Sequence, residues 1–189
     1  MTTEERKDPA MSTEHDDAQP RIISINISKK KGTQKEPCEE PQRVLEQFGL
    51  EDDAHSGDWH RQVSFLAWES IEKAQEMGLV VEEGSFAENF TTENIDLLSL
   101  PMGTQLRLGD EVLVEVSQIG KVCHTRCAIY YQAGDCIFPR EGIFAVVLHG
   151  GTVAEDDPIE VVKMGDGTCE FSPAEAIEEV EAARAAGTL

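Results

Sequence analysis

Short runs of alternating apolar and polar residues recur along this chain of 189 residues and predict β-strands. The first run covers residues 21–28, where isoleucines alternate with polar or smaller neighbours, so we expect the fold to start there. In residues 104–120, two alternating runs flank Gly109-Asp110, which predicts a hairpin with a two-residue turn. Further strands are predicted at residues 143–151 and at residues 157–164.

A helical pattern interrupts the strands at residues 64–78. Phe65, Trp68 and Ile71 follow one another at three-residue spacing, which places them on one face of a helix. Ser64 is predicted as the N-cap, and Gly78 suits the position just beyond the last turn.

The end of the chain is also predicted to be helical. Ser172 is the expected N-cap, Pro173 fits the first helical position, Glu175 completes a capping box, and Gly187 follows the last turn. The apolar positions of this helix are mostly alanine, so we expect it to pack weakly or against a partner.

Many short strands with one good internal helix predict a mainly β fold, a β-barrel with a few helices. Residues 1–20 have too little apolar content to order and are expected to form a disordered tail. Residues 21–165 would then form the barrel, and residues 166–189 a C-terminal linker and helix.

The charge of the chain excludes some partners. With 37 acidic and 16 basic residues, the formal net charge is −21. Nucleic acids and anionic membranes would be repelled, because both are bound through Lys and Arg. No apolar run is long enough to cross a bilayer, and the N-terminus lacks a secretory signal, so a cytoplasmic location is expected.

Four lysines stand out against this acidic background, and they could form a local anion pocket or simply a solvated loop. They are Lys29, Lys30, Lys31 and Lys35.

Three of the five cysteines lie close together, at Cys123, Cys127 and Cys136. Their spacing lacks the short pairs typical of zinc sites, and iron–sulfur spacing would need a cysteine where Tyr130 stands. Disulfides are rare in the cytoplasm, so Cys127 and Cys136 are expected to be packing residues, and a role as resolving thiols stays open.

Cys123 differs from the other cysteines in its setting. It follows a predicted strand just past Gly120, and Lys121, His124 and Arg126 surround it in the sequence. Positive neighbours favour the thiolate, which is both the nucleophile and the metal ligand. Cys123 is therefore the candidate for a persulfide carrier or for a thiolate ligand of a metal cofactor.

Five blocks in the observed order give the chain a resemblance to the MOSC domain, named for the C-terminal domain of molybdenum cofactor sulfurases, in its short standalone bacterial form. They lie at residues 28–37, 49–71, 84–110, 120–151 and 157–162. The resemblance implies a MOSC β-barrel of the pyruvate-kinase-like type, with Cys123 as the functional thiol. It implies the molybdenum cofactor (molybdopterin) as ligand, with Cys123 carrying sulfane sulfur or binding molybdenum.

The resemblance leaves three functions open. One is a sulfur carrier served by a separate cysteine desulfurase, since no pyridoxal phosphate site is seen in this chain. The second is a molybdenum-dependent reductase of N-hydroxylated compounds. The third is a non-catalytic module that delivers the cofactor to a molybdoenzyme or a cofactor-biosynthesis protein.

The matching blocks also supply further candidate site residues. Their basic residues, expected to bind the anionic cofactor, are Lys29, Lys31, Arg61 and Arg140. For Arg140, an ion pair with Glu141 that shapes a turn is the alternative. Asp53 would polarise the thiol, bind a metal or cap a turn; Asn89 would bind the pterin or hold its own loop. His55 and His124 would tune protonation.

Two positions depart from the family pattern, because Asp52 and Ala87 stand where glycine is usual. If the backbone at residue 52 requires a positive φ, Asp is tolerated there, but less easily than glycine.

Overall fold

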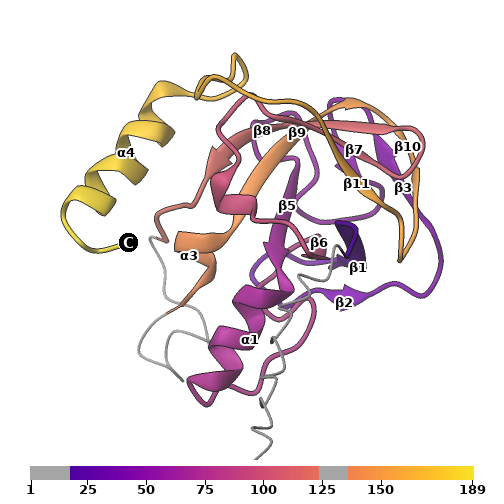
Figure 1. Cartoon of the computed structure of the whole chain (residues 1–189), viewed down its shortest axis with the longest axis horizontal. Helices are drawn as coiled ribbons and strands as arrows, with labels where there is room; N and C mark the ends of the chain where they lie inside the picture. The colour runs from indigo at the N-terminus through magenta and orange to yellow at the C-terminus, as the bar shows by residue number, and fades with distance from the viewer. Residues whose placement is uncertain (1–17, 124–135) are drawn as a thin grey trace, which may run out of the picture.

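The computed structural model of the chain describes residues 18–123 and 136–189. Within these ranges strands dominate over helices, which confirms the predicted fold class. In Figure 1 the strands form one body, and the C-terminal helix lies apart from it on the left. Most of the predicted N-terminal tail falls outside the described residues.

The strands of the described residues are β1 (Arg21–Ile27), β2 (Glu36–Pro37), β3 (Gln42–Leu45), β4 (Gly49–Leu50), β5 (Val63–Ala67), β6 (Phe90–Glu93), β7 (Gln105–Leu108), β8 (Val112–Ile119), β9 (Ile143–His149), β10 (Gly151–Val153) and β11 (Ile159–Lys163). The helices are α1 (Trp68–Glu76), the 3-10 helix η1 (Leu97–Ser99), α3 (Phe138–Glu141) and α4 (Ala174–Ala185).

The main sheet curls on itself. Among the described residues it has eight strands in the order β11-β7-β8-β9-β5-β6-β1-β2, and β3, β4 and β10 form a second, smaller sheet. The Ile22 N–H donates to the Asp157 carbonyl at 3.0 Å, and the Asp156 N–H donates to the Ile22 carbonyl at 2.8 Å. These bonds join β1 to the segment before β11, so the two sides of the sheet meet and enclose a barrel-like core.

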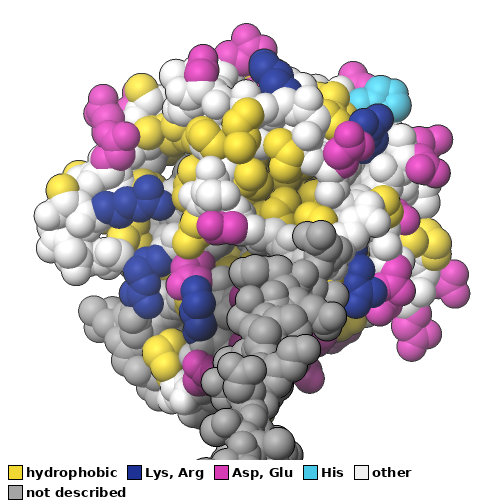
Figure 2. All heavy atoms as spheres, viewed as in Figure 1, with side chains coloured by type: hydrophobic (Ala, Val, Ile, Leu, Met, Phe, Trp, Pro, Cys, Tyr) yellow, Lys and Arg dark blue, Asp and Glu magenta, His cyan; other side chains and the backbone are white. Residues whose placement is uncertain are grey.

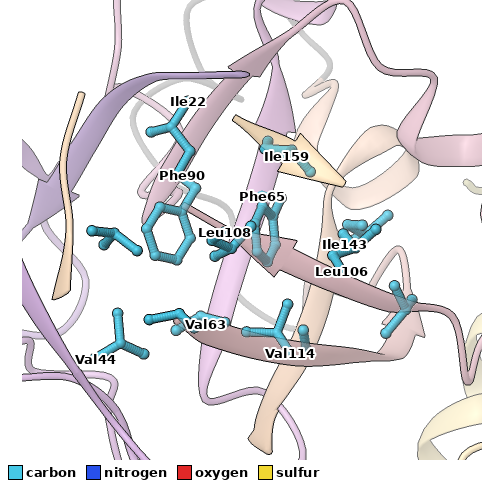
Figure 3. Packing of buried hydrophobic residues seen from close by; sticks show 14 of the residues in the cluster. Ile22, Val44, Val63, Phe65, Phe90, Leu106, Leu108, Val114, Ile143 and Ile159 are labelled. Carbon is cyan, nitrogen blue, oxygen red and sulfur yellow. The ribbon is translucent and has the colours of Figure 1, made fainter. Parts of the chain in front are cut away.

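The interior of the curled sheet is filled with aliphatic and aromatic side chains (Figure 3). Phe65 and Phe90 are fully buried, and their stacked rings have centroids 4.9 Å apart. Burial of each ring stabilises the fold by roughly 1.5–3 kcal/mol. A second cluster, including Leu66, Ile71 and Phe144, packs α1 and α3 against the outer face of the sheet. Ile143 of the first cluster pairs with Ile119 at the end of β8, and Phe144 of the second cluster comes directly after Ile143.

The predicted helix at residues 64–78 begins later than expected. Its first residues belong to strand β5, and α1 starts at Trp68 with Ala67 as N-cap, so the assignment of Ser64 as N-cap was wrong. All five residues of β5 are buried, because the core lies on one side and α1 and α3 on the other. The prediction for Gly78 is confirmed, since it follows the C-cap with φ +90°.

The predicted hairpin between β7 and β8 is confirmed, but its turn is longer than expected. Leu108 pairs with Val112, so residues 109–111 form the turn. The Gly109 N–H donates to the Pro158 carbonyl at 2.9 Å, which ties the turn to the segment just before β11.

The C-terminal helix also differs at its start. α4 begins at Ala174 with Pro173 as N-cap, and the Ser172 hydroxyl donates to the Ser117 carbonyl of β8 instead of capping the helix. Gly187 follows the helix with φ +67°, as predicted. All residues of α4 are described, and Val180 is the only one buried, so the helix packs weakly, as its alanines predict.

Candidate functional site

The turn after β8 presents Cys123 at the surface. Gly120 adopts φ +75°, and its N–H donates to the Gly142 carbonyl at 2.8 Å. The positive φ favours glycine, and a Cβ there would lie 2.7 Å from the Pro139 carbonyl oxygen. The chain therefore leaves the sheet sharply at Gly120, and the Cys123 side chain is exposed beyond it.

Arg61 reaches the same region from the loop before β5. Its guanidinium carbon lies 4.7 Å from the centre of the Trp59 ring and 5.4 Å from that of Phe144. Its Nε is buried and has no hydrogen-bond partner in the described part of the chain. Burial lowers the pKa of Arg61, while electrostatic interactions with Cys123 and Glu179 oppose that effect. The structure thus brings together the predicted thiol and one of the predicted cations.

Lys121 is a second cation at the site, which the sequence analysis named only as a neighbour of Cys123. Its Nζ lies 4.9 Å from the centre of the Phe138 ring and 5.9 Å from that of Phe144. Its backbone N–H donates to the Pro139 carbonyl at 2.9 Å. Phe144 therefore contacts two cations that come from different segments. Figure 2 shows Lys and Arg side chains gathered below α4 on the face in view.

Asp53 forms a buried ion pair that the sequence analysis did not predict. The Lys35 Nζ lies 2.6 Å from Asp53 Oδ1, and both side chains are almost fully buried. Asp53 also accepts the backbone N–H groups of Ser28 and His55. Burial alone raises the pKa of Asp53, but the interactions with His55, Lys35 and Ser28 hold it well below its usual range. The Asp53 carboxylate thus joins its own loop to the segment that carries Ser28 and Lys35. A direct contact between Asp53 and the cofactor stays a prediction.

The other candidates of these loops lie nearer to solvent. His55 is half-buried, and its Nδ1 lies 3.7 Å from Asp53 Oδ1. Lys29 pairs with Asp52 at 3.0 Å on the surface, and Lys31 is exposed. Their cofactor-binding and proton-tuning roles stay predictions.

Asn89 links three segments of the barrel. Its Oδ1 accepts the backbone N–H and the hydroxyl of Ser64, both at 3.1 Å, and its Nδ2 donates to the Asn26 carbonyl at 3.3 Å. These contacts agree with the alternative in which Asn89 holds its own loop.

Arg140 lies in α3, and its backbone is close to the Gly120 turn. Its neighbour Glu141 accepts the Ser70 hydroxyl at 2.6 Å and pairs with Lys73 at 3.1 Å. Glu141 thereby fixes α3 to α1, while a site role for Arg140 stays a prediction.

The remaining cysteines have separate surroundings. Cys136 packs against the second hydrophobic cluster, as predicted. Cys38 and Cys169 are half-buried free thiols, and burial raises the pKa of both. His124, Arg126 and Cys127 lie outside the described residues, so the predictions for them stay open.

A positive φ, considered in the sequence analysis for Asp52 only, is present at both departures from the family pattern. Asp52 and Ala87 each adopt φ +66°. A side chain there is strained, which explains why glycine suits both positions.

The MOSC domain model matches residues 52–160, which include Arg61 and Cys123. The fold and this match show that the chain belongs to the MOSC domain family, which is associated with the molybdenum cofactor. A search of curated proteins finds no match.

Three solved structures share the fold at low sequence identity. YiiM from Geobacillus stearothermophilus is 23% identical with a TM-score of 0.62, and the alignment covers 80% of each chain. YiiM from Escherichia coli is 19% identical with a TM-score of 0.60, over 88% of this chain and 94% of that one. YuaD from Bacillus subtilis is 16% identical with a TM-score of 0.63, over 75% of this chain and 94% of its own.

In the described residues, no helix has the length and apolar character needed to span a membrane.

Proposed function

We propose that this MOSC protein works in molybdenum cofactor and sulfur-transfer chemistry, with the Cys123 thiol as the working group. The observation that carries the proposal is the Arg61 guanidinium, which is held by two aromatic rings within electrostatic reach of Cys123. An exposed thiol beside a fixed cation suits the handling of an anionic ligand.

The residues fit an anionic pterin phosphate in a specific respect. The Arg61 Nε is buried without a partner among the described residues, and a buried unpaired N–H costs free energy. A phosphate oxygen would satisfy that donor, and guanidinium groups match phosphate geometry. Arg61 and Lys121 would therefore hold the phosphate end, with Cys123 at the reactive end. When bound, the cofactor would supply a molybdenum centre able to take a sulfur or thiolate ligand.

Sulfur loading of Cys123 needs only a donor persulfide. The Cys123 thiolate attacks the outer sulfur of that persulfide, the donor's S–S bond breaks as the new S–S bond forms, and the donor leaves as a thiolate. No external oxidant is required, because the outer sulfur changes carrier without a net change in oxidation state. The exposure of Cys123 allows a protein donor to approach, and we propose a cysteine desulfurase as that donor.

Peptide mass spectrometry tests this function. After incubation with a cysteine desulfurase and cysteine, the peptide containing Cys123 should gain the mass of one sulfur atom. Cys123→Ser should abolish the gain, while Cys136→Ser, at a packing residue, should leave it intact. Sulfur found only on Cys127 or Cys136 would contradict the assignment.

The same protein preparation separates the two alternatives. Turnover of an N-hydroxylated base by molybdenum-loaded protein, lost in Cys123→Ser and without sulfur loading, would favour a reductase. Cofactor binding with neither turnover nor sulfur loading would favour a delivery module.

A further inference from the structure

Gln118 connects the two segments that carry Arg61 and Cys123. It lies near the end of β8, where the pairing with β9 shifts register, and its side chain is buried. Its Nε2 donates to the Gly120 carbonyl at 2.6 Å, and its Oε1 lies 2.7 Å from His60 Nε2. One buried amide therefore contacts both the turn that leads to Cys123 and the residue next to Arg61.

The Gln118 side chain determines which His60 nitrogen carries a proton. Because the Gln118 amide nitrogen donates to Gly120, its oxygen must accept, so His60 donates from Nε2. Burial lowers the pKa of His60, the bond to Gln118 opposes this, and the charge of Arg61 lowers the pKa further. His60 is thus a neutral donor at neutral pH.

A second bond joins the same two segments. The Ser117 hydroxyl donates to the His60 carbonyl, one residue before Arg61. On the other side, the His60 ring meets the Trp59 ring edge-on at 5.9 Å, and Trp59 contacts Arg61. A shift of His60 would therefore displace both Arg61 and the aromatic ring beside it.

We propose that Gln118 is a positioning residue. Through His60, it fixes the position of the Arg61 guanidinium relative to the Cys123 thiol. The inference rests on the proposed function of Cys123 and Arg61. General stabilisation of the barrel is the competing role, and it predicts a different result below.

The test compares alkylation of Cys123 by iodoacetate, an anion, and by neutral iodoacetamide, with rates read from the Cys123 peptide. The ratio of the two rates reports the local positive field and is insensitive to a common change in thiol reactivity. Arg61→Gln should lower the ratio about three- to tenfold. Gln118→Met, similar in volume but unable to hydrogen-bond in this way, should lower it by a comparable factor. The double variant should show no further loss, because both changes remove the same contribution.

Thr91→Val is the control for a general loss of stability. Thr91 is buried on β6, which does not pair with β8, and it bonds to Asn26 and Glu88. Its ratio should equal that of the unmodified protein. If Gln118→Met fails to fold, His60→Leu breaks the same bridge from the other end and should give the same drop.

Two results would overturn the inference in distinguishable ways. A normal ratio in both Gln118→Met and His60→Leu, with a drop in Arg61→Gln, would leave Gln118 a structural residue only and keep the proposed function. An unchanged ratio in Arg61→Gln would remove the proposed anion site and the positioning role together.

Discussion

Ala87 has a side chain at a backbone conformation that favours glycine, with φ +66°. A non-glycine residue there costs roughly 1–2 kcal/mol, while glycine makes the unfolded chain more flexible by about 0.4–1 kcal/mol. Ala87→Gly should therefore raise the free energy of unfolding by up to about 1 kcal/mol in urea denaturation.

Ala67→Gly is the matched control, because Ala67 has an ordinary φ of −73°. There the flexibility cost adds to the loss of a buried methyl group, so this variant should be less stable. A loss of stability in Ala87→Gly would contradict the assigned strain.

Glu88 makes the stability depend on pH. Burial raises the pKa of this carboxyl from 4.5 to about 7, although the backbone N–H groups of Gly84 and Phe86 and the Thr91 hydroxyl favour the charged form. The folded state therefore binds a proton more tightly than the unfolded state. Its stabilising contribution is fully present below pH 4.5 and is lost as the pH rises through about 7.

Urea titrations between pH 5 and pH 8 measure this effect, which should reach about 3 kcal/mol at most. Glu88→Gln should flatten the slope, because glutamine does not titrate. Asp53 acts in another window: its pKa is lowered from 3.8, so its contribution is lost only at more acidic pH. If the free energy of unfolding of Glu88→Gln depends on pH as strongly as that of the unmodified protein, another group causes the pH dependence.

Gly120 combines a positive φ with a close contact to its Cβ position. Gly120→Ala combines the cost of φ +75° with contact against the Pro139 carbonyl oxygen at 2.7 Å, and we expect a loss of roughly 2–4 kcal/mol. Gly32→Ala is the control, since Gly32 has φ +78° with no atom within 4 Å. It should lose only about 1 kcal/mol. Equal losses in thermal melts of the two variants would show that the close contact is relieved without cost.

At the scale of elements, α4 is held by few contacts. Val180 is its buried residue, and the Arg184 Nη2 donates to the Ile119 carbonyl at 3.1 Å, next to the Gly120 turn. Arg184→Ala should therefore speed amide hydrogen exchange in α4 several-fold and leave β9 protected. Glu181→Ala, at an exposed position of the same helix, should change little. An exchange rate in Arg184→Ala equal to that in Glu181→Ala would mean that the Arg184 hydrogen bond does not hold the helix.

Element types were more predictable than element boundaries. In β1 and β8, buried residues alternate with less buried ones over part of the strand, so the alternation of apolar and polar residues is clear in the sequence. β5 is buried on both faces, and a continuous apolar run does not distinguish a strand from a helix. This is why residues 64–67 were predicted as the start of α1.

At the scale of the whole molecule, the candidate site lies where three distant segments meet. Arg61 comes from the loop before β5, Lys121 and Cys123 follow β8, and Phe144 belongs to β9. The sequence predicted Cys123 from its local charges and Arg61 from the family resemblance. It could not predict the Lys35–Asp53 pair or the Gln118 bridge, because both depend on contacts made only when the sheet curls.

The proposed function depends on Arg61 and Cys123 belonging to one anion-binding site. Its most direct test is the pterin and molybdenum content of protein purified from a host that makes the molybdenum cofactor. The intact protein and Arg107→Gln, whose arginine pairs with Glu160 on the surface, should retain the pterin, and Arg61→Gln should lose most of it. Equal retention in Arg61→Gln, or no pterin in the intact protein, would contradict the claim.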